Sequence, residues 1–286
     1  MAAGIDRSER SDRSGRSDRV PTGALAEVGS DRSTALVTGA SSGIGRSLAR
    51  LLAADGCDLV LVARRGDELE RLGAELSAAH GVTVSTHAVD LVRPDSAAGL
   101  LDRLDATGAS IDILINNAGF GMRGDFTDLP LDRQLEMIAL NVTTLTLLTR
   151  RLLPGMRSRR RGGVLNVGST AGFQPGPFMA VYYATKAYVV SFTEALAEEL
   201  SGSDVRVSCL APGPTDTGFA AEAGATDAGL FRGDVMTVDE VARIGYEGWK
   251  AGKILVVPGR RNRLRALAVR LLPRTSVVKA VRRLNE

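Results

Sequence analysis

The stretch that decides the fold is TALVTGASSGIG, residues 34–45. The apolar run at 35–38 predicts a strand, and the glycines that follow it predict a tight turn. Ile44, Leu48 and Leu51 then recur at helical spacing, so a helix begins directly after the turn. Glycines spaced G-x-x-x-G-x-G let the backbone approach an anion closely, and the first turn of the helix supplies free N–H groups. A strand, glycine turn and helix in this order predict a pyrophosphate-binding unit.

Beyond this unit, short apolar runs alternate with segments long enough to be helices. The runs are continuous rather than alternating, which indicates strands covered on both faces, as in a parallel sheet. We therefore predict an α/β fold, a doubly wound Rossmann-type domain with a seven-stranded parallel sheet and a ligand site at the carboxyl ends of its strands. The predicted strands are 35–38, 59–63, 82–89, 112–116, 163–169, 205–212 and 254–258.

The composition excludes several classes of protein. With 286 residues, 44% of them hydrophobic and 24% charged, the chain can bury a sizeable core. No run reaches the roughly 18 apolar residues of a membrane span. Cys57 and Cys209 cannot form a disulfide scaffold, which favours a cytoplasmic location. These cysteines and the two histidines, His80 and His87, show no ligand spacing, so no metal site is predicted.

The charges divide the chain into three segments. Residues 1–32 are rich in Ser, Arg and Asp, lack an apolar face and are predicted to form a disordered leader. Residues 33–258 hold the predicted Rossmann-type domain. Residues 259–286 contain nine basic residues and one acidic residue, a net charge of +8, and form a predicted basic helical tail. The sequence pI near 9.1 therefore comes from the tail and argues against a nucleic-acid-binding domain.

Further motifs follow the glycine turn in a fixed order. NNAG at 116–119 follows the fourth strand, Ser169 ends the fifth, and Tyr182 and Lys186 form YxxxK in the next helix. PGPTDT at 212–217 follows the sixth strand. Over about residues 33–258 the chain resembles the short-chain dehydrogenase/reductase (SDR) family, whose glycine motif is TGxxxGxG. The resemblance implies an enzyme that transfers a hydride between a nicotinamide and a carbonyl or secondary alcohol.

The end of the second strand indicates which dinucleotide is bound. An acidic residue there would bind a ribose 2′-hydroxyl, but this strand ends Ala63-Arg64-Arg65, and Asp58 lies at its other end. Because guanidinium groups pair with phosphate, we predict NADP(H) rather than NAD(H), with Arg64 as the main clamp and Arg65 as its neighbour. The alternative is that both arginines only cap a surface loop.

The resemblance extends this set along the cofactor. It places Asp90 and Leu91 at the adenine, residues 117–119 along the ribose side and Thr217 at the nicotinamide carboxamide. The predicted cofactor-binding residues are Gly39, Ser41, Ser42, Gly43, Ile44, Gly45, Arg64, Arg65, Asp90, Leu91, Asn117, Ala118, Gly119, Tyr182, Lys186, Pro212, Gly213, Thr215 and Thr217.

Four residues are predicted to carry the chemistry. Tyr182 and Lys186 are four apart, so a helix places both on one face, where the ammonium is expected to lower the tyrosine pKa. Tyr182 is assigned as general acid/base, Lys186 as pKa tuner and nicotinamide-ribose ligand, and Ser169 as hydrogen-bond donor to the substrate oxygen. The resemblance adds Asn141 as a proton-relay residue that holds a water near the lysine. Tyr183 lies on another helix face and is interpreted as packing.

The loops predict the substrate only as a class. The apolar loop 172–179 and a predicted mobile lid at 219–231 suggest an apolar ketone or alcohol, such as a fatty acyl, steroid-like or xenobiotic compound. NNAGFGMRGDF and ILVVPGRRNR are similar to a family branch with long-chain 3-oxoacyl reductases and hydroxysteroid dehydrogenases. Two alternatives stay open: these residues pack the domain or a dimer, or the protein is a cofactor-bound sensor or scaffold without turnover. Ser41 and Ser42 lie in no nucleophile elbow, which excludes a hydrolase.

The basic tail has two interpretations. Its leucines, from Leu264 to Leu272, follow the spacing of an amphipathic helix that Pro273 stops, and Val277, Val278 and Val281 form a second apolar set. The tail either docks on its own domain or subunit, or adsorbs to an anionic membrane or an acyl carrier's phosphates. The family resemblance also implies a homodimer or homotetramer, with helices at 131–157 and 180–200 as the contact faces.

Overall fold

The computed structural model describes Met1 and residues 32–225 and 235–286. The predictions about the leader and about the second half of the lid lie outside these residues. Residues Arg32–Glu286 form one compact unit. Among the described residues, none of the helices has the length and apolar character needed to cross a membrane.

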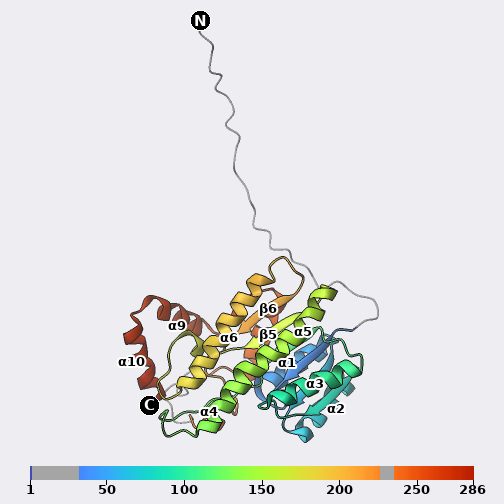
Figure 1. The fold of residues 1–286 in the computed structure, drawn as a ribbon, viewed down its shortest axis with the longest axis horizontal. Coiled ribbons are helices and arrows are strands. Elements are labelled where there is room, and N and C mark those ends of the chain that lie inside the picture. The colour runs from blue at the N-terminus through green and yellow to red at the C-terminus, as the bar shows by residue number, and fades with distance from the viewer. Residues whose placement is uncertain (2–31, 226–234) are drawn as a thin grey trace. The chain divides into compact units, whose positions relative to one another are not determined.

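One parallel sheet of seven strands forms the centre of this unit and confirms the predicted fold class (Figure 1). The strand order is β3-β2-β1-β4-β5-β6-β7, so the direction of winding reverses between β1 and β4. A crevice therefore opens at the carboxyl ends of these two strands, where such folds bind ligands. The strands are β1 (Thr34–Thr38), β2 (Asp58–Ala63), β3 (Val84–Ala88), β4 (Ile113–Asn116), β5 (Gly163–Val167), β6 (Arg206–Leu210) and β7 (Leu255–Val256).

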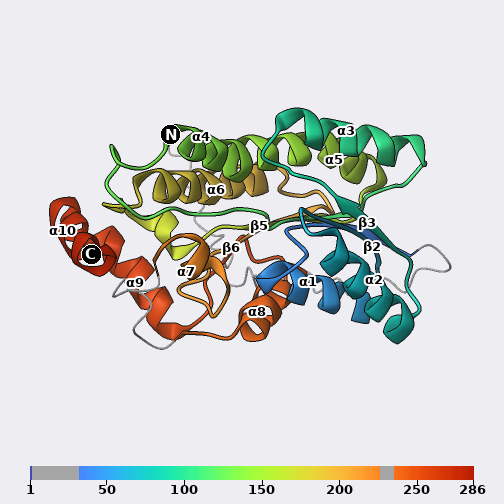
Figure 2. The same cartoon turned by 90° about the horizontal axis from the view of Figure 1, so that it is seen from below.

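Helices cover both faces of the sheet (Figure 2). Leu48 of α1, Leu69 of α2 and Leu61 of β2 are fully buried in the core of one face, and Leu36, Leu100 and Leu148 in the core of the other. Burial of each such leucine contributes about 1.5–3 kcal/mol, which explains why both strand faces are apolar. One face carries α1 (Gly43–Ala54), α2 (Gly66–His80) and α8 (Val238–Lys250), and the other carries α3 (Pro94–Ala106), α4 (Leu131–Ile138), α5 (Leu145–Arg159) and α6 (Ala180–Glu199).

Two irregular turns lie next to the carboxyl ends of the strands. The segment η1 (Ala139–Thr144) is a stretch of π-helix that joins α4 to α5, and π-helical turns occur often at functional sites. The segment η2 (Thr170–Phe173) is a 3₁₀ turn after β5, and the Ser169 hydroxyl accepts a hydrogen bond from the Ala171 N–H at 3.1 Å.

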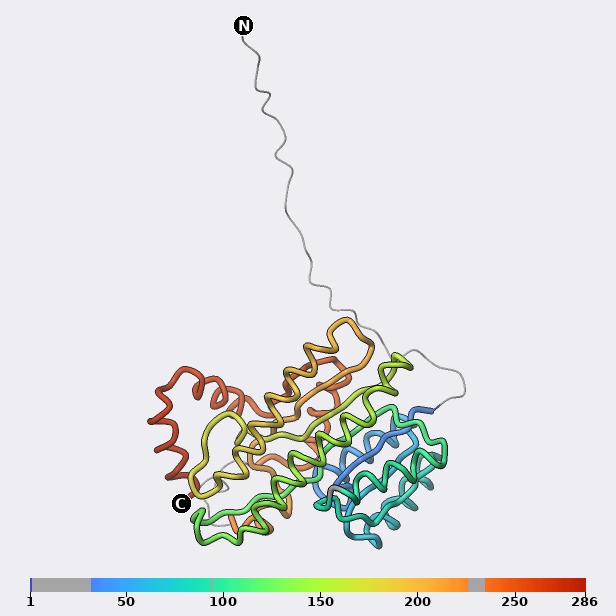
Figure 3. The backbone as a smooth tube through the Cα atoms, viewed as in Figure 1, coloured from blue at the N-terminus to red at the C-terminus, as the bar shows by residue number. Residues whose placement is uncertain are grey.

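The tail forms two helices rather than one. Pro273 separates α9 (Arg260–Leu271) from α10 (Arg274–Asn285), which confirms that the first helix stops there. Val277 and Val281 of α10 are buried, whereas Leu264 and Leu271 of α9 are 67% and 78% exposed. The domain-docked interpretation therefore holds for α10 and fails for the leucines of α9. Figure 3 shows the last helix beside the loop that leads into α6.

Candidate active site

A cleft of about 600 Å³ opens at the carboxyl ends of the strands. It gathers segments that are far apart in the sequence, because each loop after a parallel strand emerges at the same edge of the sheet. Of the predicted residues, only Gly45 and Asn141 do not line it. The predicted residues that do are Gly39, Ser41, Ser42, Gly43, Ile44, Arg64, Arg65, Asp90, Leu91, Asn117, Ala118, Gly119, Ser169, Tyr182, Lys186, Pro212, Gly213, Thr215 and Thr217.

The glycine turn forms a cradle that has no room for a side chain at Gly39 or Gly45. Gly39 has φ +65°, and a Cβ there would lie 2.7 Å from the Asn117 amide nitrogen. At Gly45 a Cβ would lie 2.4 Å from the same nitrogen and 2.5 Å from the Gly39 carbonyl oxygen. Asn117 Nδ2 donates to the Thr38 carbonyl oxygen at 2.9 Å, so the turn is tied to the loop after β4. Gly39 and Gly43 (φ +54°) shape the cradle, and Gly45 brings α1 close to the sheet.

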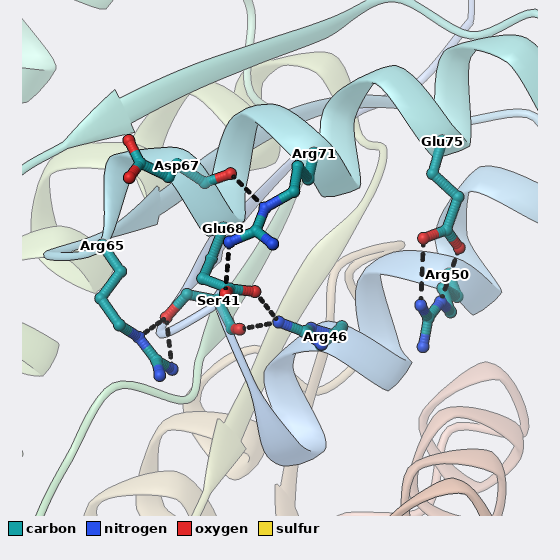
Figure 4. Close-up of polar contacts among 8 residues, drawn as sticks. All are labelled: Ser41, Arg46, Arg50, Arg65, Asp67, Glu68, Arg71 and Glu75. Atoms are coloured by element: carbon teal, nitrogen blue, oxygen red, sulfur yellow. Dashed lines mark hydrogen bonds and ion pairs between the residues drawn. The ribbon is translucent and has the colours of Figure 1, made fainter.

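Basic side chains surround Ser41 in the glycine turn (Figure 4). Arg65 donates from Nε and Nη2 to Ser41 Oγ at 3.3 and 3.1 Å. Arg46 donates to the Ser41 carbonyl oxygen and pairs with Glu68 at 2.6 Å. The sequence reasoning missed Arg46, although a basic residue directly after the glycine motif could have indicated it. Figure 4 shows the Arg65 and Arg46 side chains approaching Ser41 from different elements.

Arg64 has a partner that the sequence did not suggest. Its Nη2 lies 3.3 Å from Oε1 of Glu222, which belongs to the short helix α7 (Phe219–Glu222). Both side chains are about half exposed, so the pair contributes little stability. The pair nevertheless links the end of β2 to the described part of the predicted lid, and Glu222 also lines the cleft.

Tyr182, Ser169 and Lys186 meet at the floor of the cleft. Tyr182 is 8% exposed and shares a side-chain hydrogen bond with Ser169. Lys186 Nζ donates to the Val167 carbonyl oxygen at 2.8 Å and lies 5.8 Å from the centroid of the Tyr182 ring. The helix α6 therefore places the tyrosine and the lysine together, as their spacing predicts.

The pKa of Tyr182 shifts against the expectation from the lysine alone. Burial raises the pKa of Tyr182, and the hydrogen bond with Ser169 acts in the opposite direction. Burial also lowers the pKa of Lys186 to about 8. The pKa of Tyr182 is therefore raised overall, because removal of the phenolate from water outweighs the hydrogen bond with Ser169. The role of Lys186 as pKa tuner stays a prediction.

Asn141 lies behind the cleft rather than in it. It is 2% exposed, accepts a hydrogen bond from the Phe120 N–H at 3.2 Å and donates to Thr185 Oγ1 at 3.1 Å. A Cβ on Gly119 would lie 2.8 Å from Asn141 Oδ1 and 3.7 Å from Lys186 Nζ. The asparagine and the lysine therefore flank the same glycine, and the proton-relay role remains a prediction.

Aromatic and apolar side chains line the part of the cleft around Tyr182. The ring of Phe219 lies 5.1 Å from the Tyr182 ring, and Phe120 and Met179 line the same space. Phe219 and Met179 fall within the loops expected to border the substrate, but Phe120 was missed. No signal in the sequence singles it out beyond its place after NNAG. Among the residues that the structure describes, no three His, Cys, Asp or Glu side chains are grouped to hold a metal ion.

The cleft fits a dinucleotide phosphate. Gly39 and Gly43 line the cleft at the start of α1, where a pyrophosphate would approach, and three arginines stand beside this turn. The Asn117–Gly119 loop, Thr217 and Lys186 continue the lining toward Tyr182. The residues predicted to hold a nicotinamide dinucleotide therefore line one cleft, apart from Gly45.

The chain is similar to oxidoreductases in sequence and in structure. It is 38% identical over 180 residues to a very-long-chain 3-oxoacyl-CoA reductase of Laccaria bicolor. The matched region covers 62% of this chain and 53% of that protein, so the chain spans about half of that relative's length. It is 36% identical over 213 residues to an NADP-dependent 3-hydroxy acid dehydrogenase of Schizosaccharomyces pombe, covering 74% of this chain and 80% of the other.

A solved structure agrees with these relatives. The short-chain dehydrogenase from Sphingobium yanoikuyae, solved in complex with NADPH, is 36% identical, with a TM-score of 0.75 over 82% of this chain and 92% of that one. The family model described as short chain dehydrogenase matches residues 33–228. The chain belongs to the short-chain dehydrogenase/reductase family.

Proposed function

We propose that the protein is an NADP(H)-dependent oxidoreductase acting on a carbonyl or secondary alcohol of an apolar substrate. The observation that carries the proposal is the meeting of Ser169, Tyr182 and Lys186 in the same cleft as the glycine cradle. The nicotinamide, when bound, supplies or accepts the hydride. The side chains supply the proton and hold the substrate oxygen.

The protonation states favour reduction. Because burial raises the pKa of Tyr182, its hydroxyl keeps its proton at neutral pH and can donate it to a carbonyl oxygen. Ser169 stands beside that hydroxyl as a second donor to the same oxygen. Lys186, with a pKa of about 8, is mostly an ammonium at pH 7 and can bind the nicotinamide ribose.

The substrate is inferred from the cleft wall. Phe120, Met179 and Phe219 offer no charge to a sugar or carboxylate, which favours a fatty acyl, steroid-like or xenobiotic ketone. The names of the Laccaria and fission-yeast relatives, a 3-oxoacyl reductase and a 3-hydroxy acid dehydrogenase, support an acyl substrate. The two unpaired, buried cysteines suit a cytoplasmic enzyme.

A panel of 3-oxoacyl thioesters, steroid ketones and aryl ketones, followed by NADPH absorbance, tests the activity. Tyr182→Phe should lower kcat about 10²–10⁴-fold with NADPH binding retained, because only the proton donor is lost. Full turnover by Tyr182→Phe would contradict the assignment of Tyr182 as the proton donor. Tight NADPH binding without turnover of any substrate would instead favour the sensor or scaffold.

The cofactor preference rests on the two arginines after β2. Arg64→Ala/Arg65→Ala should lower kcat/KM for NADPH at least tenfold and leave that for NADH within about twofold, because only NADPH carries the 2′-phosphate. Measurement of both cofactors on the wild type, each single variant and the double variant tests this. An unchanged ratio in the double variant, or a wild type that prefers NADH, would show that the arginines only cap the loop.

A second candidate function is binding to an anionic membrane through α9. Leu264, Leu267 and Leu271 are all more than half exposed, while Ala266 and Val269 on the opposite side are partly buried. Exposed arginines flank the leucine stripe on both sides, and the helix contains no acidic residue. Each basic residue near an anionic bilayer contributes about 1 kcal/mol, so charge and apolar surface act together.

Vesicle sedimentation tests this second candidate on the full chain. The protein should sediment with phosphatidylserine-containing vesicles more than with pure phosphatidylcholine, and less at high salt. Serine at positions 264, 267 and 271 should abolish the difference. Equal sedimentation of wild type and variant would exclude membrane binding through α9, and a change in oligomeric mass alone would assign the stripe to a second copy of the chain.

A further inference from the structure

The carboxyl-terminal helix α10 reaches the active-site wall through one buried side chain. Asn285 is 0% exposed, and it bonds to one residue of the segment that leads into α6 and to one residue in the first turn of α6. Its Nδ2 donates to the Pro177 carbonyl oxygen at 2.9 Å, and its Oδ1 accepts a hydrogen bond from the Tyr183 hydroxyl at 3.3 Å. We propose that Asn285 is a positioning residue that shapes the substrate pocket for bulky apolar ketones. This inference rests on the proposed reductase function.

The segment that Asn285 holds is an unusual turn. Phe178 has φ +65°, a left-handed conformation that a bulky residue adopts only when its surroundings impose it. Met179 N–H donates to the Gly176 carbonyl oxygen at 3.1 Å, and Gly124 N–H donates to the Phe178 carbonyl oxygen at 2.9 Å. The turn sets the place of Met179, which lines the cleft next to Tyr182.

Tyr183 transmits the same restraint to the catalytic residue. Its ring packs so closely on Gly176 that a Cβ there would lie 2.3 Å from it. On its other side it meets the Tyr182 ring edge-to-face, with the ring centroids 6.2 Å apart. Because Asn285 bonds both the hydroxyl of this ring and the carbonyl of Pro177, it ties the turn to the first turn of α6, which carries Tyr182.

The remaining contacts of α10 hold Asn285 in place. Val277 and Val281 belong to the same buried cluster as Phe120, Met179 and Tyr182. Arg282 lies over the Phe178 ring, 5.1 Å from its centroid, and Arg123 donates to the backbone carbonyl oxygen of Asn285. The two views in Figures 1 and 2 both place α10 beside the start of α6.

Only an amide satisfies both partners, which makes the inference testable by substitution. Asp at position 285 keeps an acceptor for the Tyr183 hydroxyl but turns a carboxylate oxygen toward the Pro177 carbonyl oxygen. Leu at the same position has a side chain of similar size but loses the hydrogen bonds to Tyr183 and Pro177. If the Gly176–Met179 turn is no longer held in place, binding of a bulky substrate that contacts the cleft wall should weaken. Binding of a small substrate that does not reach the wall should stay unchanged. We expect Asn285→Leu and Asn285→Asp to raise KM for a bulky ketone about tenfold.

The experiment compares two vicinal diketones, benzil and diacetyl, which present the same reacting group with different bulk. KM and kcat for both, NADPH Kd and Tm are measured for the wild type, Asn285→Leu, Asn285→Asp and Tyr183→Phe, which removes only the hydroxyl. Arg283→Ala, exposed on the same helix, is the matched control. The inference predicts a raised benzil KM in the three variants, with kcat for diacetyl and NADPH Kd within about twofold of wild type.

The other outcomes separate the inference from the function on which it rests. Equal losses for both diketones together with a lower Tm would mean a structural role only and would overturn the inference. An unchanged ratio of the two KM values in an active enzyme would overturn it as well and leave the reductase function standing. If the wild type reduced neither diketone nor any other carbonyl of the panel, the proposed function and this inference would both fail.

Discussion

At the scale of single residues, the burial of Lys186 lowers the stability of the folded protein. Its side chain is buried, and its only described hydrogen-bond partner is the Val167 carbonyl oxygen at 2.8 Å. Burial lowers its pKa from 10.5 to about 8, which means that the folded state disfavours the ammonium. A shift of this size corresponds to about 3 kcal/mol of destabilisation at neutral pH.

Lys186→Met should therefore stabilise the protein without cofactor. We expect the free energy of unfolding at pH 7 to rise by about 2 kcal/mol, because loss of the hydrogen bond to Val167 offsets about 1 kcal/mol of the relief. Between pH 8 and pH 10.5 the unfolded wild type binds a proton that the folded protein lacks, so wild-type stability rises with pH there. The advantage of the variant should shrink over this range and vanish above it.

Urea unfolding of the wild type and Lys186→Met at pH 7 and pH 10, with activity measured in parallel, tests the predicted difference in stability and its decrease with pH. Turnover should be lost in Lys186→Met at both pH values. A variant less stable than wild type at pH 7, or an equal difference at both pH values, would contradict the assignment of the shift to burial of the charge.

At the scale of elements, the approach of α1 to the sheet depends on Gly45. A Cβ there would meet the Asn117 amide and the Gly39 carbonyl oxygen, and the latter is backbone that cannot turn away. Gly45→Ala should cost about 1–3 kcal/mol of stability and weaken NADPH binding, because α1 must move out from β1 and β4. Urea unfolding and a fluorescence titration with NADPH measure both effects.

Gly99 in α3 is the matched control for the glycine of α1. The nearest atom to a Cβ there is Arg103 Nη1 at 3.7 Å, the far end of a flexible side chain. Gly99→Ala should therefore stabilise the protein by about 0.5–1 kcal/mol, the usual gain in a helix interior, and leave NADPH binding unchanged. Equal effects of the two substitutions would show that α1 tolerates a side chain at 45.

At the scale of the whole molecule, the outer face of α4 exposes several large apolar side chains. Leu131, Leu135 and Ile138 of α4 are 66%, 53% and 40% exposed, and Tyr188 of α6 is 37% exposed. These two helices fall within the ranges 131–157 and 180–200 that the family resemblance implies as contact faces. Such surfaces mark contacts between proteins. We expect a homodimer or homotetramer that buries this face.

Leu135→Glu should shift the oligomer to a smaller mass in size-exclusion chromatography with light scattering, because burial of an unpaired carboxylate is costly. Leu267→Glu on α9 serves as the control on a second apolar surface and should leave the mass unchanged. If Leu267→Glu alone dissociated the oligomer, the contact face would be α9 rather than α4.

The sequence by itself determined the features that depend on neighbouring residues. The apolar runs predict all seven strands, the glycine spacing predicts the turn after β1, and the i,i+4 spacing predicts that Tyr182 and Lys186 share a helix face. These signals are local, because the periodicities of strands and helices depend only on residues that are close in the sequence. The alternation of strands and helices then restricts the topology to few arrangements.

Only the tertiary structure decided what depends on distant residues. The pKa of Tyr182 follows from its burial, Arg64 is joined to Glu222, and Asn285 reaches Pro177 over 108 positions of sequence. The same holds for the tail, whose two apolar sets look alike in the sequence, yet one is buried and the other exposed. Burial and long-range hydrogen bonds depend on which surfaces meet after folding, and no local pattern encodes that meeting.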